Sequence, residues 1–461
     1  MSELSYRAGI GQTRHWRLQT RLPESAALNV GFALHLDGKL DRDALAGAVG
    51  ELYERHGALR SSFALRGDEL WVTERPAAGW QLPVSTPPRV GREGADQVLA
   101  TEAARPFDLA EGVFRACLVI SGPEQASLGV VFHHSVFDGW SFNVFFGELA
   151  ALYVARSSGQ PSPLAESPRP YGEFAEWQRA AAESSQWDRQ LDYWREQLSG
   201  FEPRPTLPRD RDPGTPPHRV ALAALTLTSG ATEQVEQAAR RLRTLPFVVL
   251  LAAYQATLSA RGHADDCVVG SPFVGRRGSS WRGTIGLFVN TVPLRANLAS
   301  NPTLADLVAQ TRTSVRGGHA NQDVPLDRVM ADHLDAPSFA GLFDTLAQMQ
   351  SARRESVALG GLSVDLAPLW NVHTKYDLLV SFGRRPDSLV GLFEYNADAF
   401  DESTVLGLVG GYAGVLAALC RRPDRRVSEL GHAEELDFRP VRGADLPSLG
   451  LRSVMAETGL A

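Results

Sequence analysis

The chain has 461 residues, 44% of them hydrophobic and 21% charged, and a formal net charge of −7. Its length exceeds what one hydrophobic core usually supports, so two domains or lobes are expected, and its composition is that of an ordinary globular protein. Acidic and basic residues are interspersed without a basic stripe, and the longest apolar run, near residues 247–254, is too short to cross a bilayer, which argues against nucleic-acid and membrane partners.

The N-terminal 20 residues contain no apolar stretch of the kind found in a secretory signal. The three cysteines, Cys117, Cys267 and Cys420, are far apart and lie among mainly apolar residues. They are more typical of buried thiols in a reducing compartment than of disulfides or metal ligands. A cytoplasmic location is therefore expected.

The first 155 residues alternate short apolar strands with helices. A strand is predicted at 30–36, followed by a helix at 41–56. Two further strands, at 114–120 and 128–134, are predicted to be antiparallel neighbours joined by the Ser-Gly-Pro turn at 121–123. A buried helix rich in aromatic residues is expected from Ser141 onward.

Two histidines end the last of these strands and are followed closely by an acid and a glycine. His133 and His134 cannot share one role, because successive side chains of a strand point to opposite faces. Asp138 and Gly139 come after the strand breaks, where a turn can aim a histidine at a pocket. An acid in such apolar surroundings needs a partner, so Asp138 is more plausibly paired with an arginine than free to act as a base.

Taken alone, this stretch is equally consistent with two structural histidines, one buried and hydrogen-bonded and the other exposed. A metal site is disfavoured, because the two rings lie on opposite faces and no Cys or Glu lies nearby at ligand spacing.

The second part of the chain is predicted to form another mixed α/β lobe. The loop at 156–170 and the helical stretch at 171–198 lead into a proline-rich loop at 200–218. Beyond it we expect the elements of a second lobe: a strand at 221–228, helices at 233–242 and 246–260, and a strand at 267–270. The Gly-Arg-Arg-Gly stretch from Gly275 to Gly278 lacks the spacing of a phosphate-binding loop, so we interpret it as a plain surface loop. The expected division is 1–177 and 178–461, with a polar tail after about residue 420.

Several stretches, in order, resemble the signature motifs of nonribosomal peptide synthetase condensation domains. The His-His-x-x-x-Asp-Gly stretch with its trailing Trp-Ser matches the active-site motif of that family, and both histidines are kept. The chain departs from the usual pattern at Gly9 and Gly11, where Ser and Ala are usual, and at Gly57, where Glu is common. The matching stretches are 9–18, 55–63, 133–141, 171–177, 285–295, 321–326, 376–378 and 392–396.

This resemblance implies a fold of the α/β (α+β) class, with two lobes resembling chloramphenicol acetyltransferase set as a V around an active-site tunnel. It implies acyl transfer from the phosphopantetheine thioester of a peptidyl or acyl carrier protein to an amine or alcohol, forming an amide or ester. The acceptor would be a small molecule or carrier-bound, and neither a bound cofactor nor a metal is required.

The same resemblance implies the roles of the site residues. His134 would orient the nucleophile, accept its proton, or both, and the Gly139 N–H would stabilise the oxyanion. His133 would support the turn, and Asp138 would hold the loop through Arg295. The remaining residues would support the site or line the tunnel: Arg55 and Arg60 in structural roles, and Trp140, Asn290 and Thr291 at the tunnel and its floor.

The intact motif and the lack of adenylation or carrier motifs favour a free-standing condensation enzyme. Two alternatives remain open at this point: an acyltransferase of the same superfamily that uses coenzyme A thioesters, and a non-catalytic module that docks carrier proteins.

Overall fold

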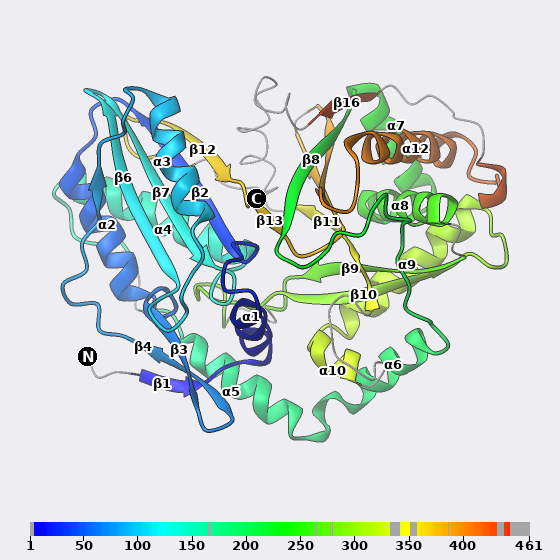
Figure 1. The fold of residues 1–461 in the computed structure, drawn as a ribbon, viewed down its shortest axis with the longest axis horizontal. Helices are drawn as coiled ribbons and strands as arrows, with labels where there is room; N and C mark the ends of the chain where they lie inside the picture. The colour runs from blue at the N-terminus through cyan, green and yellow to red at the C-terminus, as the bar shows by residue number, and fades with distance from the viewer. Residues whose placement is uncertain are drawn as a thin grey trace.

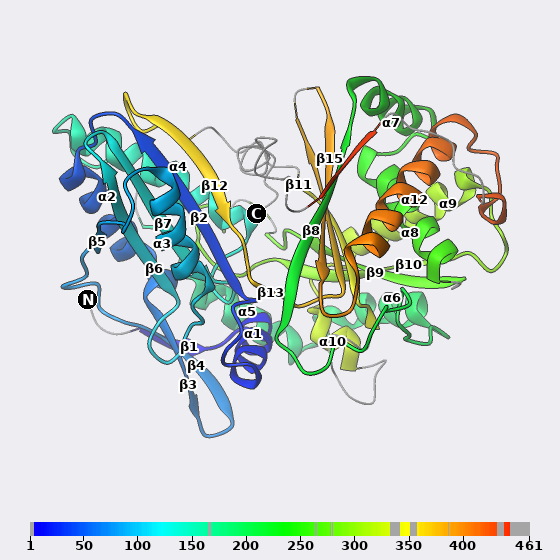
Figure 2. The ribbon, with the colours of Figure 1, turned by 45° about the horizontal axis from the view of Figure 1, so that its top comes forward.

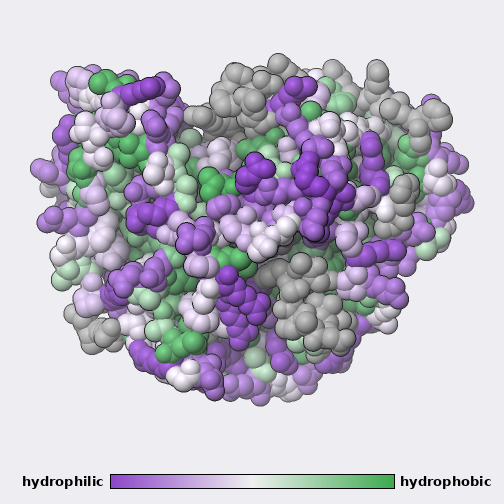
Figure 3. Space-filling model, in the orientation of Figure 1, coloured by the Kyte–Doolittle hydropathy of each residue, from purple (hydrophilic) through white to green (hydrophobic). Residues whose placement is uncertain are grey.

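The computed structural model describes residues 4–442 except for 165–166, 263–264, 277, 279, 332–341, 351–356, 386 and 431–437. The described chain forms two mixed α/β lobes that lie side by side (Figure 1), as expected from its length. Hydrophilic side chains cover much of both lobes on the face drawn in Figure 3, with apolar residues in smaller separate patches.

The first lobe is built on a five-stranded sheet whose two faces are both covered by helices. Helices α2 (Arg42–Arg55) and α4 (Gly139–Ser157) pack on one face, and α3 (Arg92–Ala104) packs on the other. Strands buried on both faces are expected to be almost continuously apolar, as 126–132 is. The strand order is β12 (Ser363–Leu369), β2 (Asn29–Asp37), β7 (Gln125–His133), β6 (Phe114–Gly122) and β5 (Val84–Ser85).

A small sheet and two helices extend the first lobe downward in Figure 1. The sheet has the order β1 (Leu4–Arg7), β4 (Glu69–Glu74) and β3 (Ser61–Arg66). Helix α1 (Ile10–Arg21) lies between the two lobes in both ribbon views (Figures 1 and 2). Helix α5 (Tyr171–Ala182) and α6 (Asp188–Leu198) then carry the chain across to the second lobe.

The second lobe is an eight-stranded sheet with helices on one face. Those helices are α7 (Ser229–Arg241), α8 (Pro246–Gly262), α9 (Leu304–Ala320) and α12 (Glu402–Arg421), while the short α10 (Leu326–Ala331) lies near α1 and α6. In Figure 2, β8 turns toward the first lobe. The strand order is β10 (Asn290–Asn297), β9 (Asp266–Phe273), β11 (Thr345–Gln350), β14 (Leu378–Arg384), β15 (Leu389–Asn396), β8 (His218–Leu227) and β13 (His373–Thr374), with β16 (Phe438–Arg442) also paired to β8.

The later part of the chain contributes one strand to the sheet of the first lobe. β12 follows most of the second lobe in sequence, yet it pairs antiparallel with β2 at the edge of the first sheet, as Figure 1 shows in yellow. The division at residue 177 did not anticipate this strand, because its short, mixed sequence carries no mark of the sheet that it joins.

Most predicted elements of the first lobe are present, including the antiparallel pairing of β6 with β7 across a turn. The stretch 171–198 is not one helix: it breaks after Ala182, and the Ser184 side chain accepts a hydrogen bond from the Gln186 N–H within the break. Helix α12 has the length and hydropathy of a membrane span, but 61% of the apolar window is buried within the lobe, which is typical of a core helix.

Candidate functional site

The two histidines lie where a buried strand gives way to a buried helix. β7 ends at His133, and the His134 N–H donates to the carbonyl of Leu28 at 2.8 Å. Asp138 is the N-cap of α4: its Oδ1 accepts from the Ser141 N–H at 2.8 Å, which satisfies one of the free donors of the first turn. Gly139 is the first helical residue. The strand–turn–helix setting predicted for this stretch is confirmed.

His133 points into the core and holds the turn, which is the position predicted for it. Its side chain is fully buried, and Nδ1 lies 2.7 Å from the Ser135 hydroxyl oxygen. Burial lowers the pKa of His133 well below its ordinary value, with the neighbouring His134 adding to the effect. A neutral ring in this position suits a structural role.

His134 is partly exposed and has one ring nitrogen fixed by the protein. Its Nδ1 lies 2.8 Å from the carbonyl oxygen of Phe137, an acceptor only, so Nδ1 carries the proton and Nε2 keeps a lone pair. Burial, followed by the positive charge of Lys375, lowers the pKa of His134 to about 4. The ring is therefore neutral near pH 7 and is able to accept a proton or a hydrogen bond through Nε2.

Asp138 is paired with Arg276, and the predicted partner, Arg295, is wrong. Arg276 Nη2 lies 2.9 Å from Asp138 Oδ1, and each of the two side chains is 2% exposed. The other carboxylate oxygen, Oδ2, accepts from the Phe288 N–H at 3.0 Å. Asp138 thus ties the turn after β7 to the loop that joins β9 to β10. The prediction of an arginine partner is confirmed, and only the choice of arginine is wrong.

The interpretation of the stretch around Arg276 as a plain surface loop is wrong for this residue, because its side chain is buried. Besides Asp138, its guanidinium donates to the carbonyls of Trp281 and Thr284, each at 2.6 Å, and stacks 3.9 Å from the ring centre of Phe288. The sequence signal was weak: nothing local distinguishes this arginine from its neighbour in the Gly-Arg-Arg-Gly stretch.

The other arginines singled out from the sequence lie away from Asp138. Arg295 pairs with Asp266 at 2.7 Å across β9 and β10. Arg55 joins α2 to Glu148 of α4 at 3.2 Å, and Arg60 lies 3.6 Å from Glu74 of β4. Each of these pairs lies within a single lobe: those of Arg55 and Arg60 within the first, and that of Arg295 within the second.

Two of the residues predicted at the tunnel floor, Asn290 and Thr291, lie in the second lobe shortly after Phe288, whose N–H donates to Asp138. The third predicted tunnel residue, Trp140, lies in the first turn of α4. Asn290 begins β10 and donates through Nδ2 to the carbonyls of Gln322 and Val324, at 2.9 and 2.7 Å, so it joins two of the matching sequence stretches. Thr291 follows it and is 9% exposed. Trp140 stays partly exposed, and its Nε1 donates to the carbonyl of Arg282 at 2.9 Å.

Three further charged or titratable residues were not predicted: His15 and Lys375, which act on His134, and Glu394, which acts on Lys375. His15 of α1 places its ring centre 5.1 Å from that of His134. Lys375 follows β13, and burial and the Arg14 charge lower its pKa to about 8. Glu394 of β15, opposite Leu379 on the next strand, has its pKa raised to about 7 by burial, with Lys375 acting in the other direction. Lys375 is one of only two lysines in the chain, which was the available signal.

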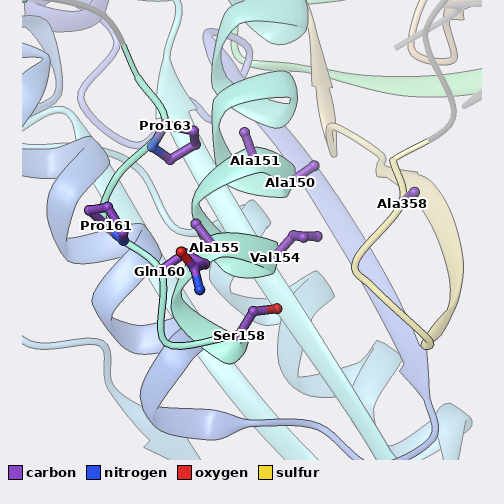
Figure 4. A pocket seen from close by; sticks show the side chains of 9 residues that line it. All are labelled: Ala150, Ala151, Val154, Ala155, Ser158, Gln160, Pro161, Pro163 and Ala358. Carbon is purple, nitrogen blue, oxygen red and sulfur yellow. The ribbon is translucent and has the colours of Figure 1, made fainter.

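A cavity of about 540 Å³ lies apart from these residues, along the last turns of α4 (Figure 4). Small apolar side chains such as Ala151 and Val154 line it together with Gln160 and Ala358. His134 lies before the opposite end of the same helix, so this cavity is not the site built around the histidines.

The family model described as "Condensation domain" matches residues 5–437. A linear gramicidin synthase of Brevibacillus parabrevis is 33% identical over 443 residues, which cover 94% of this chain but only 6% of that protein. The chain therefore spans a small fraction of this curated relative.

Two solved structures resemble the whole fold. The X-domain from teicoplanin biosynthesis, solved in complex with OxyB, is 25% identical with a TM-score of 0.83, covering 93% of this chain and 96% of that one. SgcC5 from Streptomyces globisporus, solved with (R)-(-)-1-(2-naphthyl)-1,2-ethanediol and sucrose, is 25% identical with a TM-score of 0.72, covering 87% and 94%. These likenesses confirm the predicted fold class of two chloramphenicol-acetyltransferase-like lobes.

Proposed function

The chain belongs to the condensation-domain family, and from this premise we propose that it transfers an acyl or aminoacyl group from the phosphopantetheine thioester of a carrier protein to an amine or alcohol. The observation that carries this proposal is the state of His134: a neutral ring whose Nδ1 is fixed to the Phe137 carbonyl and whose Nε2 keeps its lone pair.

In this reaction the nitrogen or oxygen of the acceptor attacks the thioester carbonyl and forms the new C–N or C–O bond. The carbonyl oxygen becomes an oxyanion, and the Gly139 N–H, one of the helix N–H groups that lack an intrahelical partner, donates to it. When the C–S bond breaks, the electron pair leaves with the sulfur. The proton lost by the acceptor passes through His134 Nε2 to the thiolate.

The low basicity of His134 fits this sequence of steps. A ring with a pKa of about 4 is unprotonated at the start and does not hold the proton it accepts, so it returns that proton readily to the thiolate, which is a stronger base. Because the thioester is already activated, orientation of the reactants supplies much of the rate. Asp138, fixed by Arg276 and by the Phe288 N–H, has a positioning role and is not a base.

A specific observation favours a second function. The X-domain, which is similar over most of this chain, was solved as a complex with OxyB, so this fold can also present a docking surface. In that case the protein would bind a carrier protein or an enzyme partner without transferring an acyl group.

SgcC5 was solved with a diol, and this supports keeping an alcohol among the acceptors of the proposed acyl transfer.

The proposal is tested by incubating the protein with a panel of acylated carrier proteins, each alone or with a set of amines and alcohols, and reading the products by mass spectrometry. We expect a new amide or ester that depends on the protein and on the carrier-bound donor. The same acyl groups on coenzyme A form the comparison arm, and equal rates there would favour the coenzyme A alternative. Carrier binding without transfer from any donor would favour the docking module and overturn the proposal.

A further inference from the structure

One face of α1 buries three polar side chains at helical spacing, Gln12, His15 and Gln19. Gln12 accepts a hydrogen bond from the Gly9 N–H, and Gln19 donates to the carbonyls of the following loop, so both serve the local backbone. His15 is 6% exposed, and its Nδ1 is buried without a hydrogen-bond partner in the protein.

The partner that His15 does have is the ring of His134. The ring centres are 5.1 Å apart with the planes inclined at 51°, a tilted contact and not a hydrogen bond between nitrogens. Burial, then the nearby His134 and Arg14, lowers the pKa of His15 well below its ordinary value, so this ring is also neutral. A neutral imidazole offers one N–H donor and one acceptor nitrogen.

Packing alone does not account for an imidazole at this position. A leucine or methionine would fill the space against His134 without leaving a buried polar atom unsatisfied, and such atoms are unfavourable enough to be rare in folded proteins. Binding sites, by contrast, commonly combine an apolar wall with a few polar groups that a ligand satisfies.

We propose that His15 is an acceptor-binding residue. Its imidazole hydrogen-bonds a polar group that the acceptor carries on the carbon next to the one that bears the attacking nitrogen or oxygen. This inference rests on the proposed acyl transfer and deepens it, because it names the acceptor class. His134 holds the nitrogen or oxygen that attacks, and His15 holds the neighbouring group. The acceptor is then a compound with two adjacent hydrogen-bonding groups, such as a 1,2-amino alcohol or a 1,2-diol.

The test compares matched acceptors that differ in one hydroxyl: 2-amino-1-phenylethanol against 2-phenylethylamine, and 1-phenyl-1,2-ethanediol against 2-phenylethanol. With a donor that the wild-type protein uses, kcat and KM are measured for each member. The variants are His15→Leu, His15→Gln, which keeps a donor and an acceptor, and Thr20→Leu as a control on the exposed side of α1.

We expect the wild type to favour the hydroxyl-bearing member by about 10-fold or more in kcat/KM, the value of one hydrogen bond in a buried site. His15→Leu should remove this preference, mainly by raising KM for the hydroxyl-bearing compound. The compound that lacks the hydroxyl should be used almost as before. His15→Gln should restore part of the preference, and Thr20→Leu should leave it unchanged.

Equal losses for both members of a pair in His15→Leu would overturn the proposal, because they would indicate a packing role. An unchanged preference would overturn it as well, and so would a wild type that acylates other acceptors but refuses both pairs. A wild type that transfers no acyl group to any acceptor would instead refute the proposed function. If His15→Leu does not fold, as judged from its thermal unfolding, His15→Met takes its place.

Discussion

Replacing Arg276 with methionine should destabilise the protein by about 3–5 kcal/mol, the usual cost of removing one partner from a buried ion pair. Asp138 and Arg276 are each 2% exposed, so water cannot replace the lost charge. The carboxylate keeps its bonds to the Ser141 and Phe288 N–H groups, but the Trp281 and Thr284 carbonyls lose their donor. Methionine is a flexible apolar side chain that adapts to irregular space, which keeps the cavity contribution small.

The assay is unfolding in urea, followed by the fluorescence of the nine tryptophans. The matched control is Arg169→Met: Arg169 lies in the same region, stacks on Trp281 and pairs with Glu173, but it is 50% exposed. Its loss should cost about 1 kcal/mol or less, as is usual for exposed pairs.

A double-mutant cycle between Asp138→Asn and Arg276→Met should give a coupling energy of about 1 kcal/mol or more, because the two side chains are in contact. The same cycle with Arg295→Met should give almost none, because Arg295 pairs with Asp266. Equal destabilisation by Arg276→Met and Arg169→Met, or stronger coupling of Asp138 to Arg295, would refute this reasoning.

Two further variants test the chemistry of the site. Gly139→Pro removes the N–H that is assigned to the oxyanion. Proline is tolerated here because Gly139 is the first helical residue, the residue before it is extended, and the space around a new Cβ is open. We expect kcat to fall by about 10²–10³-fold in Gly139→Pro, while Gly139→Ala keeps both the N–H and the rate. Equal effects of the two substitutions would contradict the oxyanion role. Lys375→Met removes a positive charge, which is the second largest cause, next to burial, of the lowered pKa of His134. The pKa of His134 should therefore rise, and the acid limb of the pH profile of kcat/KM should move to higher pH. Lys375→Arg and the exposed Lys39→Met should leave the limb in place, and an unmoved limb in Lys375→Met would contradict the electrostatic link.

The local elements were readable from the sequence because each carries its own pattern. The run that ends at His133 is apolar and of strand length, and the stretch after Ser141 is apolar at helical spacing, so the strand, the turn and the helix around the motif were all predicted. The need of Asp138 for a cationic partner also followed, from the cost of burying an unpaired charge.

What the sequence could not provide was the meeting of distant segments. Arg276 lies 138 positions from Asp138 and Arg295 lies 157 positions away, and no local pattern distinguishes the two. The same limit hid Lys375 and His15, which reach His134 from the stretch after β13 and from α1. It also hid β12, whose place in the first sheet depends on the return of the chain from the second lobe.

The role of His134 in proton transfer is tested by the rate of acyl transfer by His134→Ala, measured together with its affinity for the carrier protein. We predict a fall in kcat/KM of about 10²–10⁴-fold, the usual contribution of a general base, with carrier binding unchanged. Unchanged product formation by His134→Ala, in a protein that still folds and binds the carrier, would contradict the claim that His134 moves the proton.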